Sequence, residues 1–320
     1  MGIGPEAVEL FRTLRDNGEL EGLNSVIELG DQEIPTSGWH YNYAKTFISS
    51  ITGKEPKSDP ITTQEFYEVL GINDYACIDV NGRNGALVYD LNTDIMQNYG
   101  IDKTYDLVSN FGTTEHIFNQ YQCFKNIHDL LKVGGLAIHI LPFEGYLNHG
   151  YFNYQPSFFV DLGIANSYEL VGIYYSAEMA GFRNTIPIPY TDDLPLVLHE
   201  LCLAGKFSYT PHNNTSSLEV VYRKTLAAPF QLPFDARFSD INELHNNYVA
   251  ISMPQRDNVS NKAMYKDIEK YMEGRGLLYR LREVRADPKI MIRMLRNFPK
   301  FMKRKLKNFL FQKFMIGEYE

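Results

Sequence analysis

Short apolar segments that alternate with helix-like segments are the feature that most constrains the fold of this chain. Apolar runs expected to form buried strands lie at residues 24–30, 75–80, 86–90, 105–110, 135–142, 168–175 and 218–223. Segments with helical spacing or helix-start signals separate several of them, at 38–70, 118–131 and 157–166. Continuous apolar strands that alternate with helices are typical of a parallel sheet covered on both faces. The sequence therefore predicts an α/β fold with a doubly wound, mostly parallel sheet of seven strands.

Composition and hydropathy argue against a membrane-spanning protein, a secreted protein and a protein with a cysteine-based zinc or redox site. Hydrophobic residues make up 44% of the 320 positions and charged residues 22%, which is ordinary for a globular chain. No apolar run approaches the roughly 20 residues that cross a bilayer, and residues 1–20 mix Glu, Asp and Arg where a signal peptide would be apolar. Cys77, Cys123 and Cys202 form no Cys-x-x-Cys pair that could begin a zinc or redox site. We expect a cytoplasmic protein with reduced cysteines.

Charge and residue pattern divide the chain near residue 225. Residues 261–320 hold 16 Lys and Arg against 7 Asp and Glu, a net +9, whereas residues 1–260 hold 15 against 32, a net −17. We therefore expect an α/β domain over 1–225 and, over 226–320, an irregular segment followed by a basic helical extension. Within the first domain, residues 34–74 predict a helical insertion, in which Thr62 and Glu65 fit a capping box.

The basic extension predicts two helices, at 261–283 and 289–314. From residue 299 onward apolar residues repeat at helical spacing while lysines and arginines occupy the remaining faces. Such a helix could lie on an anionic membrane surface or an acidic partner, as a peripheral contact. Packing on the protein's own acidic body, or on a second subunit of a homodimer, fits the charge of residues 1–260 better. No nucleic-acid partner is expected, because the rest of the chain shows no basic-aromatic face.

Polar residues follow the first two predicted strands, at the point where each strand ends. The first strand ends in Glu28, Gly30 and Asp31, and Asp79 ends the second. Ligands of doubly wound sheets bind beyond the carboxyl ends of the strands. There Gly30 would let the backbone approach a ligand closely, and Asp79 could hold the two hydroxyl groups of a ribose. Each residue by itself fits a plain turn equally well.

The third and fourth strand ends carry further candidates. Asp90 and Asn92 could meet an adenine amino group, or could simply form a turn. The fourth strand runs into residues 109–116, where a glycine and several polar side chains, including Glu115 and His116, precede the next helix. This segment is the densest candidate site in the chain.

In this order and spacing, the strand ends resemble those of class I S-adenosylmethionine-dependent methyltransferases over roughly residues 24–225. The matching segments are the first motif at 26–30, the ribose-binding acid Asp79, the adenine loop Asp90-Leu91, the fourth-strand motif at 105–110 and the helix-to-strand turn at 130–136. The resemblance implies a Rossmann-like methyltransferase fold with S-adenosylmethionine as its cofactor. The residues that it implies as cofactor contacts are Glu28, Gly30, Asp31, Asp79, Asp90, Leu91, Asn110 and Phe111.

Two departures from the family pattern bear on function. Gln32 and Ile34 occupy the positions of the two further glycines that usually follow Gly30. The stretch before the second strand is longer than usual and carries aromatic residues, which we expect in the core more often than in a cleft. The missing glycines favour a non-catalytic methyltransferase-fold protein that binds or scaffolds, whereas the retained Asp79 and Asp90 favour an enzyme.

Three histidines are candidates for a general base, which methylation of a hydroxyl group needs and methylation of an amine does not. His149 follows the fifth predicted strand, where an active-site mouth is expected, and is the preferred base. Glu115 and His116 are further catalytic candidates, with helix capping or support as their expected role. His139 lies among apolar residues and is expected in the core. Together with His149, Glu115 and His116 could form a carboxylate-imidazole metal site. No metal is assigned, because Gly112 stands where the longer Glu-x-x-Glu-His metal pattern of some family members has its first glutamate.

These observations together predict an enzyme that transfers a methyl group from S-adenosylmethionine to oxygen or nitrogen of a small-molecule acceptor. An acceptor of natural-product or surface-glycan type fits the aromatic and polar residues at 148–154 better than a nucleic acid does. A binding or scaffolding protein is the alternative.

Overall fold

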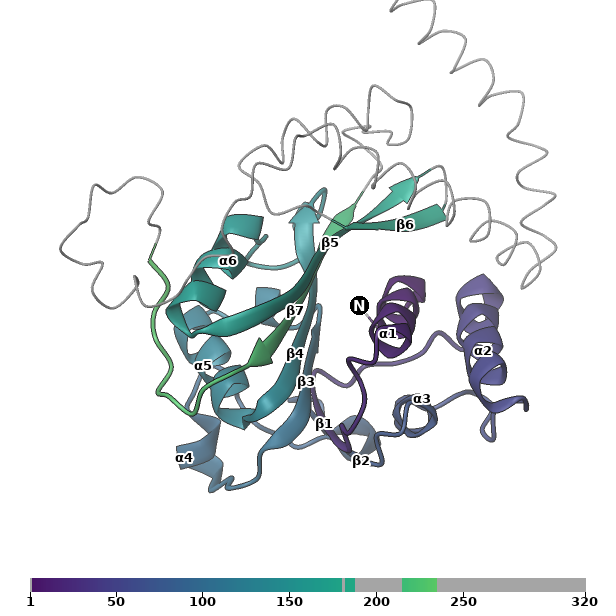
Figure 1. The fold of residues 1–320 in the computed structure, drawn as a ribbon, viewed down its shortest axis with the longest axis horizontal. Coiled ribbons are helices and arrows are strands. Elements are labelled where there is room, and N and C mark those ends of the chain that lie inside the picture. The colour runs from purple at the N-terminus through teal and green to yellow at the C-terminus, as the bar shows by residue number, and fades with distance from the viewer. Residues whose placement is uncertain (1, 180–181, 188–214, 235–320) are drawn as a thin grey trace, which may run out of the picture.

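A computed structural model describes residues 2–179, 182–187 and 215–234, and shows one sheet covered by helices on both faces (Figure 1). The strands are β1 (Ser25–Leu29), β2 (Asp74–Ile78), β3 (Tyr105–Phe111), β4 (Leu131–Glu144), β5 (Tyr168–Met179), β6 (Phe182–Pro187) and β7 (Ser216–Lys224). The helices are α1 (Pro5–Asp16), α2 (Gly38–Thr52), α3 (Thr63–Val69), α4 (Ile95–Tyr99), α5 (Gln120–Leu130) and α6 (Pro156–Ala165). Short 3-10 turns η1 (Arg83–Gly85) and η2 (Thr114–His116) lie after β2 and β3.

The sheet has the order β2-β1-β3-β4-β7-β5-β6 and is mixed. The pairs among β2, β1, β3 and β4 are parallel, whereas β7 pairs antiparallel with both β4 and β5, and β6 pairs antiparallel with β5. The expectation of a mostly parallel sheet therefore holds for one half only. Strand periodicity shows which side chains are buried but not the direction of the neighbouring strand, and the antiparallel half could not be read from it.

Six of the seven predicted strands are present, and the prediction for residues 86–90 is wrong. That segment makes only an isolated bridge between Ile78 and Leu87. Gly82, Asn84 and Gly85 have φ values of 61°, 52° and 80° just before it. Because this left-handed backbone curls the chain after β2, the segment does not run alongside the sheet for long. The seventh strand of the sheet, β6, comes from residues 182–187, for which no strand was predicted.

The helices form two layers. In Figure 1, α1, α2 and α3 cover one face of the sheet, and α4, α5 and α6 cover the other. Helix α1, for which no helix was predicted, begins with a proline, a residue well suited to the first turn of a helix. The helix start at residue 62 is confirmed, since the Thr62 hydroxyl accepts a hydrogen bond from the Glu65 N–H at 3.1 Å.

Alternation along β1 divides the core between these layers. Val26 belongs to the cluster under α1 to α3, while Ile27 and Leu29 belong to the cluster under α4 to α6, and all three are 0% exposed. Glu28 therefore points toward the α1 to α3 side, into an apolar layer. Cys77 and Cys123 are buried free thiols.

The carboxyl ends of the parallel strands meet at one edge. Register pairs Leu29 of β1 with Ile78 of β2 and with Asn110 of β3, and pairs Phe111 with Ile140 of β4. From β1 the chain moves first to β2 on one side and then to β3 on the other. This reversal of strand order is the position where doubly wound sheets bind their ligands.

Two of the predicted helices lie in a part of the chain that the structure does not describe. The helices predicted at 261–283 and 289–314 lie outside the described residues, so the domain boundary near residue 225 remains a prediction. Within the part of the chain that the structure describes, no helix has the length and apolar character needed to cross a membrane.

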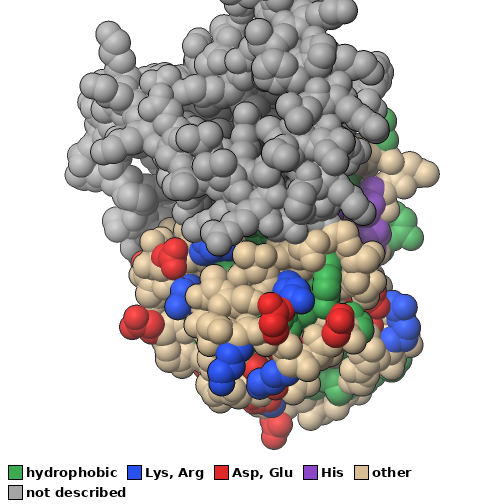
Figure 2. Space-filling view, turned by 90° about the vertical axis from the view of Figure 1, so that its right-hand side faces the viewer, with side chains coloured by type: hydrophobic (Ala, Val, Ile, Leu, Met, Phe, Trp, Pro, Cys, Tyr) green, Lys and Arg blue, Asp and Glu red, His purple; other side chains and the backbone are tan. Residues whose placement is uncertain are grey.

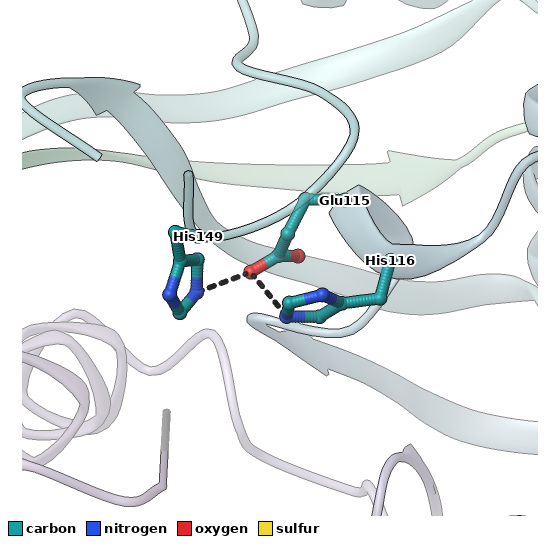
Figure 3. A group of neighbouring side chains, drawn as sticks. All are labelled: Glu115, His116 and His149. Atoms are coloured by element: carbon teal, nitrogen blue, oxygen red, sulfur yellow. Dashed lines mark ion pairs between the residues drawn. The ribbon is translucent and has the colours of Figure 1, made fainter. Parts of the chain in front are cut away.

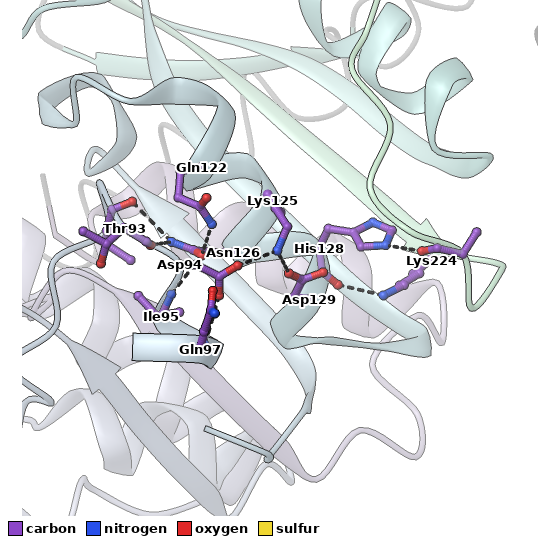
Figure 4. A network of polar contacts seen from close by, with 12 residues as sticks. Thr93, Asp94, Ile95, Gln97, Gln122, Lys125, Asn126, His128, Asp129 and Lys224 are labelled. Carbon is purple, nitrogen blue, oxygen red and sulfur yellow. Dashed lines mark hydrogen bonds and ion pairs between the residues drawn. The ribbon is translucent and has the colours of Figure 1, made fainter. Parts of the chain in front are cut away.

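A buried asparagine joins α5 to the loop that follows Asp90 (Figure 4). Asn126 is 0% exposed, and its amide nitrogen donates to the carbonyl oxygens of Leu91 at 3.2 Å and Thr93 at 2.9 Å. Its carbonyl oxygen accepts from the Ile95 N–H at 3.3 Å. At the C-terminal end of α5, the Lys224 ammonium donates to the His128 and Leu131 carbonyls at 2.7 and 3.0 Å.

Replacing Asn126 by leucine should lower the free energy of unfolding by about 3 kcal/mol, because two carbonyls and one N–H lose their buried partners. Urea denaturation measures this change. The exposed Asn98 on α4 provides a control, since Asn98→Ala should change stability by less than about 0.5 kcal/mol. Equal stability of the two variants would contradict the assignment of Asn126 as the anchor of this loop.

Candidate functional site

A glycine turn after β1 lies against the segment that follows β3. Gly30 has a φ of 87°, and its N–H donates to the Ile78 carbonyl at 2.8 Å. A Cβ atom on Gly30 would lie 2.5 Å from the Thr113 hydroxyl and 2.7 Å from the Gln32 amide nitrogen. The Thr113 hydroxyl donates to the Leu29 carbonyl at 2.6 Å. Both backbone conformation and space therefore require glycine here.

Gln32 and Ile34, where further glycines were expected, are both buried. The Gln32 amide nitrogen folds back onto the Leu29 carbonyl at 3.0 Å, and the Thr63 hydroxyl donates to the Gln32 carbonyl at 2.6 Å. Ile34 is 3% exposed and belongs to the core. The Gln32 side-chain oxygen is buried and has no hydrogen-bond partner among the described residues. This turn is thus shaped by packed side chains, with one unused acceptor beside Gly30.

Asp31 and Asp79 lie together beyond the ends of β1 and β2. The Asp79 carboxylate accepts from the backbone N–H groups of Asp31 and Asn81, each at 2.9 Å. The Asp31 side chain is 2% exposed, and its two oxygens accept from the Asn84 amide at 3.1 and 3.0 Å. Arg83 Nε lies 3.8 Å from an Asp31 oxygen. The structure therefore brings both predicted acids to the strand edge.

Arg83 and Asn84 were not identified from the sequence. Gly82 and Gly85 flank them, which is a signal for a curled loop but not for its direction. Only the tertiary structure shows that this loop turns back toward Asp31.

Asp90 and Leu91 form a turn at the start of the next loop. One Asp90 oxygen accepts from the backbone N–H and from the side-chain amide of Asn92, each at 2.9 Å. The Asp90 residue is exposed, whereas Leu91 is 4% exposed and packs in the core. This geometry matches the turn reading of Asp90, and contact of either residue with a cofactor stays a prediction.

Glu28 lies inside the sheet, one residue short of the strand end. Its carboxyl group is 0% exposed and accepts hydrogen bonds from Tyr67 at 2.8 Å and Tyr75 at 2.9 Å. Burial raises the pKa of Glu28 to about 8, so the group is mostly protonated at neutral pH. Glu28 thus links β1 to α3 and β2 through two tyrosines that were not among the predicted site residues.

Asn110 and Phe111, at the end of β3, also point inward. The Asn110 amide donates to the Thr114 hydroxyl and to His139 Nδ1, each at 3.0 Å. Phe111 is 1% exposed, and its ring lies 6.1 Å from that of Phe11. His139 is 2% exposed, and burial lowers its pKa to about 3, in agreement with its expected place in the core. Cofactor contacts of Asn110 and Phe111 remain predictions.

The predicted catalytic residues Glu115, His116 and His149 come together in one cluster (Figure 3). Glu115 and His116 belong to η2, directly after β3, and His149 lies in the loop after β4, the next strand of the sheet. Glu115 Oε1 lies 3.8 Å from His116 Nε2 and 3.5 Å from His149 Nε2. The adjacency of β3 and β4 therefore joins residues that are more than thirty positions apart in the sequence.

Backbone contacts hold the two halves of this cluster in place. The N–H groups of Tyr151 and Phe152 donate to the Glu115 carbonyl at 2.8 and 3.3 Å. A Cβ atom on Gly150 would lie 2.9 Å from the same oxygen, so the loop packs on η2 at its glycine. Gly150 was not among the predicted site residues, although its position beside His149 was a signal.

Burial decides the charge state of the cluster. Desolvation raises the pKa of Glu115 to about 7 and lowers the pKa values of His116 and His149. Both imidazoles are therefore largely neutral near pH 7, with a nitrogen lone pair free to take a proton or bind a cation. The role of His149 as a base stays a prediction.

Comparisons with known proteins give only distant similarities. No protein-family model and no curated protein sequence matches the chain. A SAM-dependent methyltransferase from Archaeoglobus fulgidus is 14% identical, with a TM-score of 0.37, and the match covers 67% of this chain and 94% of that one. TehB from Haemophilus influenzae is 9% identical, with a TM-score of 0.36 and 67% of this chain covered. The chain spans 62% of the length of TehB.

A third similar structure is the O-methyltransferase from the trans-AT PKS multienzyme of Brevibacillus brevis, solved with S-adenosyl-L-homocysteine. It is 12% identical to this chain, with a TM-score of 0.34, and the match covers 71% of this chain and 79% of that one. Because all these similarities are distant, the roles of individual residues rest on the geometry of this chain.

Replacing Glu28 by glutamine should make stability less dependent on pH. A carboxyl group whose pKa rises from 4.5 in the unfolded chain to about 8 in the folded one stabilises fully below 4.5, and this contribution is lost as the pH rises toward 8. Glutamine does not titrate. The free energy of unfolding of Glu28→Gln, relative to that of the unchanged protein, should therefore rise between about pH 5 and about pH 8.5, by a few kcal/mol at most.

Urea denaturation at both pH values measures this difference. A stability difference between the two proteins that stays constant across the range would contradict a buried, protonated Glu28.

Proposed function

We propose that this protein is an S-adenosylmethionine-dependent methyltransferase that acts on oxygen or nitrogen of a small-molecule acceptor. One observation carries the proposal: the acidic edge formed by Gly30, Asp31 and Asp79 lies where the strand order reverses, and it adjoins a carboxylate-imidazole cluster. Thr113, which touches the Gly30 turn, is two residues from Glu115. Thr113 thus links the acidic edge to the segment that carries Glu115, and this link supports treating the two groups as parts of one site.

The charge of this edge favours S-adenosylmethionine over a dinucleotide. A diphosphate is bound by the N-terminus of a helix that follows the first strand directly, with glycines in the turn. Here α2 begins only at Gly38, and the turn after β1 carries Asp31 beside Asp79. Two carboxylates would repel a diphosphate, whereas they attract the sulfonium and ammonium groups of S-adenosylmethionine.

Individual groups fit parts of this cofactor. Asp79 lies at the tip of β2, where a carboxylate can accept from ribose hydroxyls. The unused oxygen of Gln32 is a buried acceptor beside Gly30, suited to a donor such as an ammonium group. Bound at this edge, the cofactor supplies an electrophilic methyl group, and the chain's task is to hold the acceptor in line with it and exclude water.

Exposed aromatic side chains next to the cluster support a small-molecule acceptor. Phe118 is 77% exposed and Tyr151 is 71% exposed, and their rings stand edge to face at 6.4 Å. Each lies two residues from a histidine of the cluster. Figure 2 shows histidine side chains at the surface beside hydrophobic ones, while acidic and basic side chains intermingle over the face in view. Apolar faces with polar edges suit a sugar or natural-product scaffold better than a nucleic acid.

A second candidate function is a binding or scaffolding protein without catalysis. The burial of Gln32 and Ile34 at positions where glycines would make room for a ligand favours it. Cofactor binding separates the two functions. We further propose that the protein is cytoplasmic. Residues 261–320 would contact a second subunit or a membrane.

Asp79→Ala should abolish binding of S-adenosylmethionine with little loss of fold, because it removes the carboxylate that holds the ribose and orders the Asp31 N–H. Isothermal titration with S-adenosylmethionine and with S-adenosylhomocysteine measures this. Asp74→Ala is the matched control, since Asp74 lies at the opposite end of β2 with a half-exposed side chain paired to Lys103. Unchanged binding in Asp79→Ala would overturn the assignment, and no binding in the unchanged protein would favour the scaffold.

His149→Ala should keep its affinity for S-adenosylmethionine and lose turnover on hydroxyl acceptors, by roughly 100-fold or more. The variant lacks the imidazole that would accept the proton of the hydroxyl group or bind a cation that makes this group more acidic. Release of S-adenosylhomocysteine from a panel of sugar, phenol and amine acceptors measures turnover. Full activity of the variant on a hydroxyl acceptor would exclude His149 from the reaction.

A further inference from the structure

The Glu115 carboxylate is buried without a partner that satisfies it. The side chain is 0% exposed, and neither of its oxygens has a hydrogen-bond partner in the described part of the chain. The two nearest imidazole nitrogens, at 3.5 and 3.8 Å, lie beyond hydrogen-bond distance. Leaving a buried carboxylate in this state is costly, and such groups are normally paired or bound to a metal.

The spacing of the three side chains suits one ion. Two ligand atoms that each lie about 2.1 Å from a tetrahedral metal ion are about 3.4 Å apart. Glu115 Oε1 lies 3.5 Å from His149 Nε2 and 3.8 Å from His116 Nε2, and all the ligand atoms lie within 4.8 Å of one another. Small rotations of the two histidines would bring both nitrogens into coordination range.

We propose that Glu115, His116 and His149 bind one divalent transition-metal ion and leave further coordination positions open. Two imidazoles and one carboxylate form a donor set that suits Zn²⁺ and its neighbours, whereas Ca²⁺ and Mg²⁺ prefer oxygen ligands. Three protein ligands with an open position are typical of catalytic rather than structural zinc sites. Gly112 contributes no side chain, so this set lacks the first glutamate of the longer pattern.

The surroundings of the cluster support both access and rigidity. The side chains of His116 and His149 are 45% and 35% exposed, so an ion can reach them from solvent. Glu115 is fixed from the other side, where Tyr151 and Phe152 donate to its carbonyl and Gly150 packs against it. The backbone that carries Glu115 is thus held in place before the ion arrives, which lowers the cost of binding.

The ion would serve the proposed methyl transfer, and this step rests on that function. A hydroxyl acceptor at an open position would lose its proton to solvent more readily, since a divalent cation lowers the pKa of a bound hydroxyl. Its oxygen would then form a bond to the methyl carbon as the carbon–sulfur bond breaks, and the sulfur would keep the electron pair. His149 would act as a ligand rather than as a base.

Equilibrium dialysis of the full chain against Zn²⁺, and the absorption spectrum of the chain loaded with Co²⁺, test the site. We expect one ion per chain, with Glu115→Gln, His116→Ala and His149→Ala each weakening binding at least roughly tenfold. His40→Ala is the control, because it removes an imidazole outside the cluster and should leave binding unchanged. No stoichiometric ion in the unchanged protein, or equal binding in all variants, would overturn the site.

Titration of the same samples with S-adenosylmethionine separates this inference from the proposed function. Metal binding that is lost in the cluster variants supports the metal site even where no S-adenosylmethionine binds, and that result would overturn the methyltransferase alone. S-adenosylmethionine binding without any bound metal would overturn the metal site alone. Urea denaturation of each cluster variant shows whether it remains folded.

Discussion

The pairing of β1 with β2 on one side and β3 on the other is the constraint on which the rest of the structure depends. It brings the turn after β1 into contact with the segments after β2 and β3, through Asp79 on one side and Thr113 on the other. Each contact uses a side chain of one loop to satisfy a backbone group of another. A change in this strand order would separate the acidic edge from the Glu115 cluster.

Two buried carboxyl groups, those of Glu28 and Glu115, differ in whether the protein supplies them with hydrogen-bond partners. Glu28, inside the sheet, is satisfied by two tyrosine hydroxyls, and its raised pKa keeps it neutral as part of the core. Glu115, at the strand edge, is equally buried but faces two imidazoles that are too distant to satisfy it. The difference lies in the partners and not in the degree of burial. Only the second arrangement leaves an unmet interaction that a ligand could supply.

Much of the fold and part of the site were readable in the sequence. The strand predictions at β1 to β5 and β7 hold because apolar runs signal burial directly, and the Thr62 helix start holds because its signal is local. The prediction for residues 86–90 failed because left-handed backbone at Gly82, Asn84 and Gly85 curls the chain, and the apolar character of the segment does not reveal this. Glu28, Asn110 and Phe111 were placed at the edge by their position in the sequence, whereas the register turns their side chains inward.

The sequence alone determined which segments are buried and that polar groups follow the strands, because these depend on local patterns of apolar and polar residues. Only the tertiary structure decided which strands are neighbours and in which direction they run. It therefore decided that Asn84 reaches Asp31, and that His149 meets Glu115. The physical reason is that hydrogen bonds between strands and contacts between loops join residues far apart in the chain, and no local pattern encodes their distance.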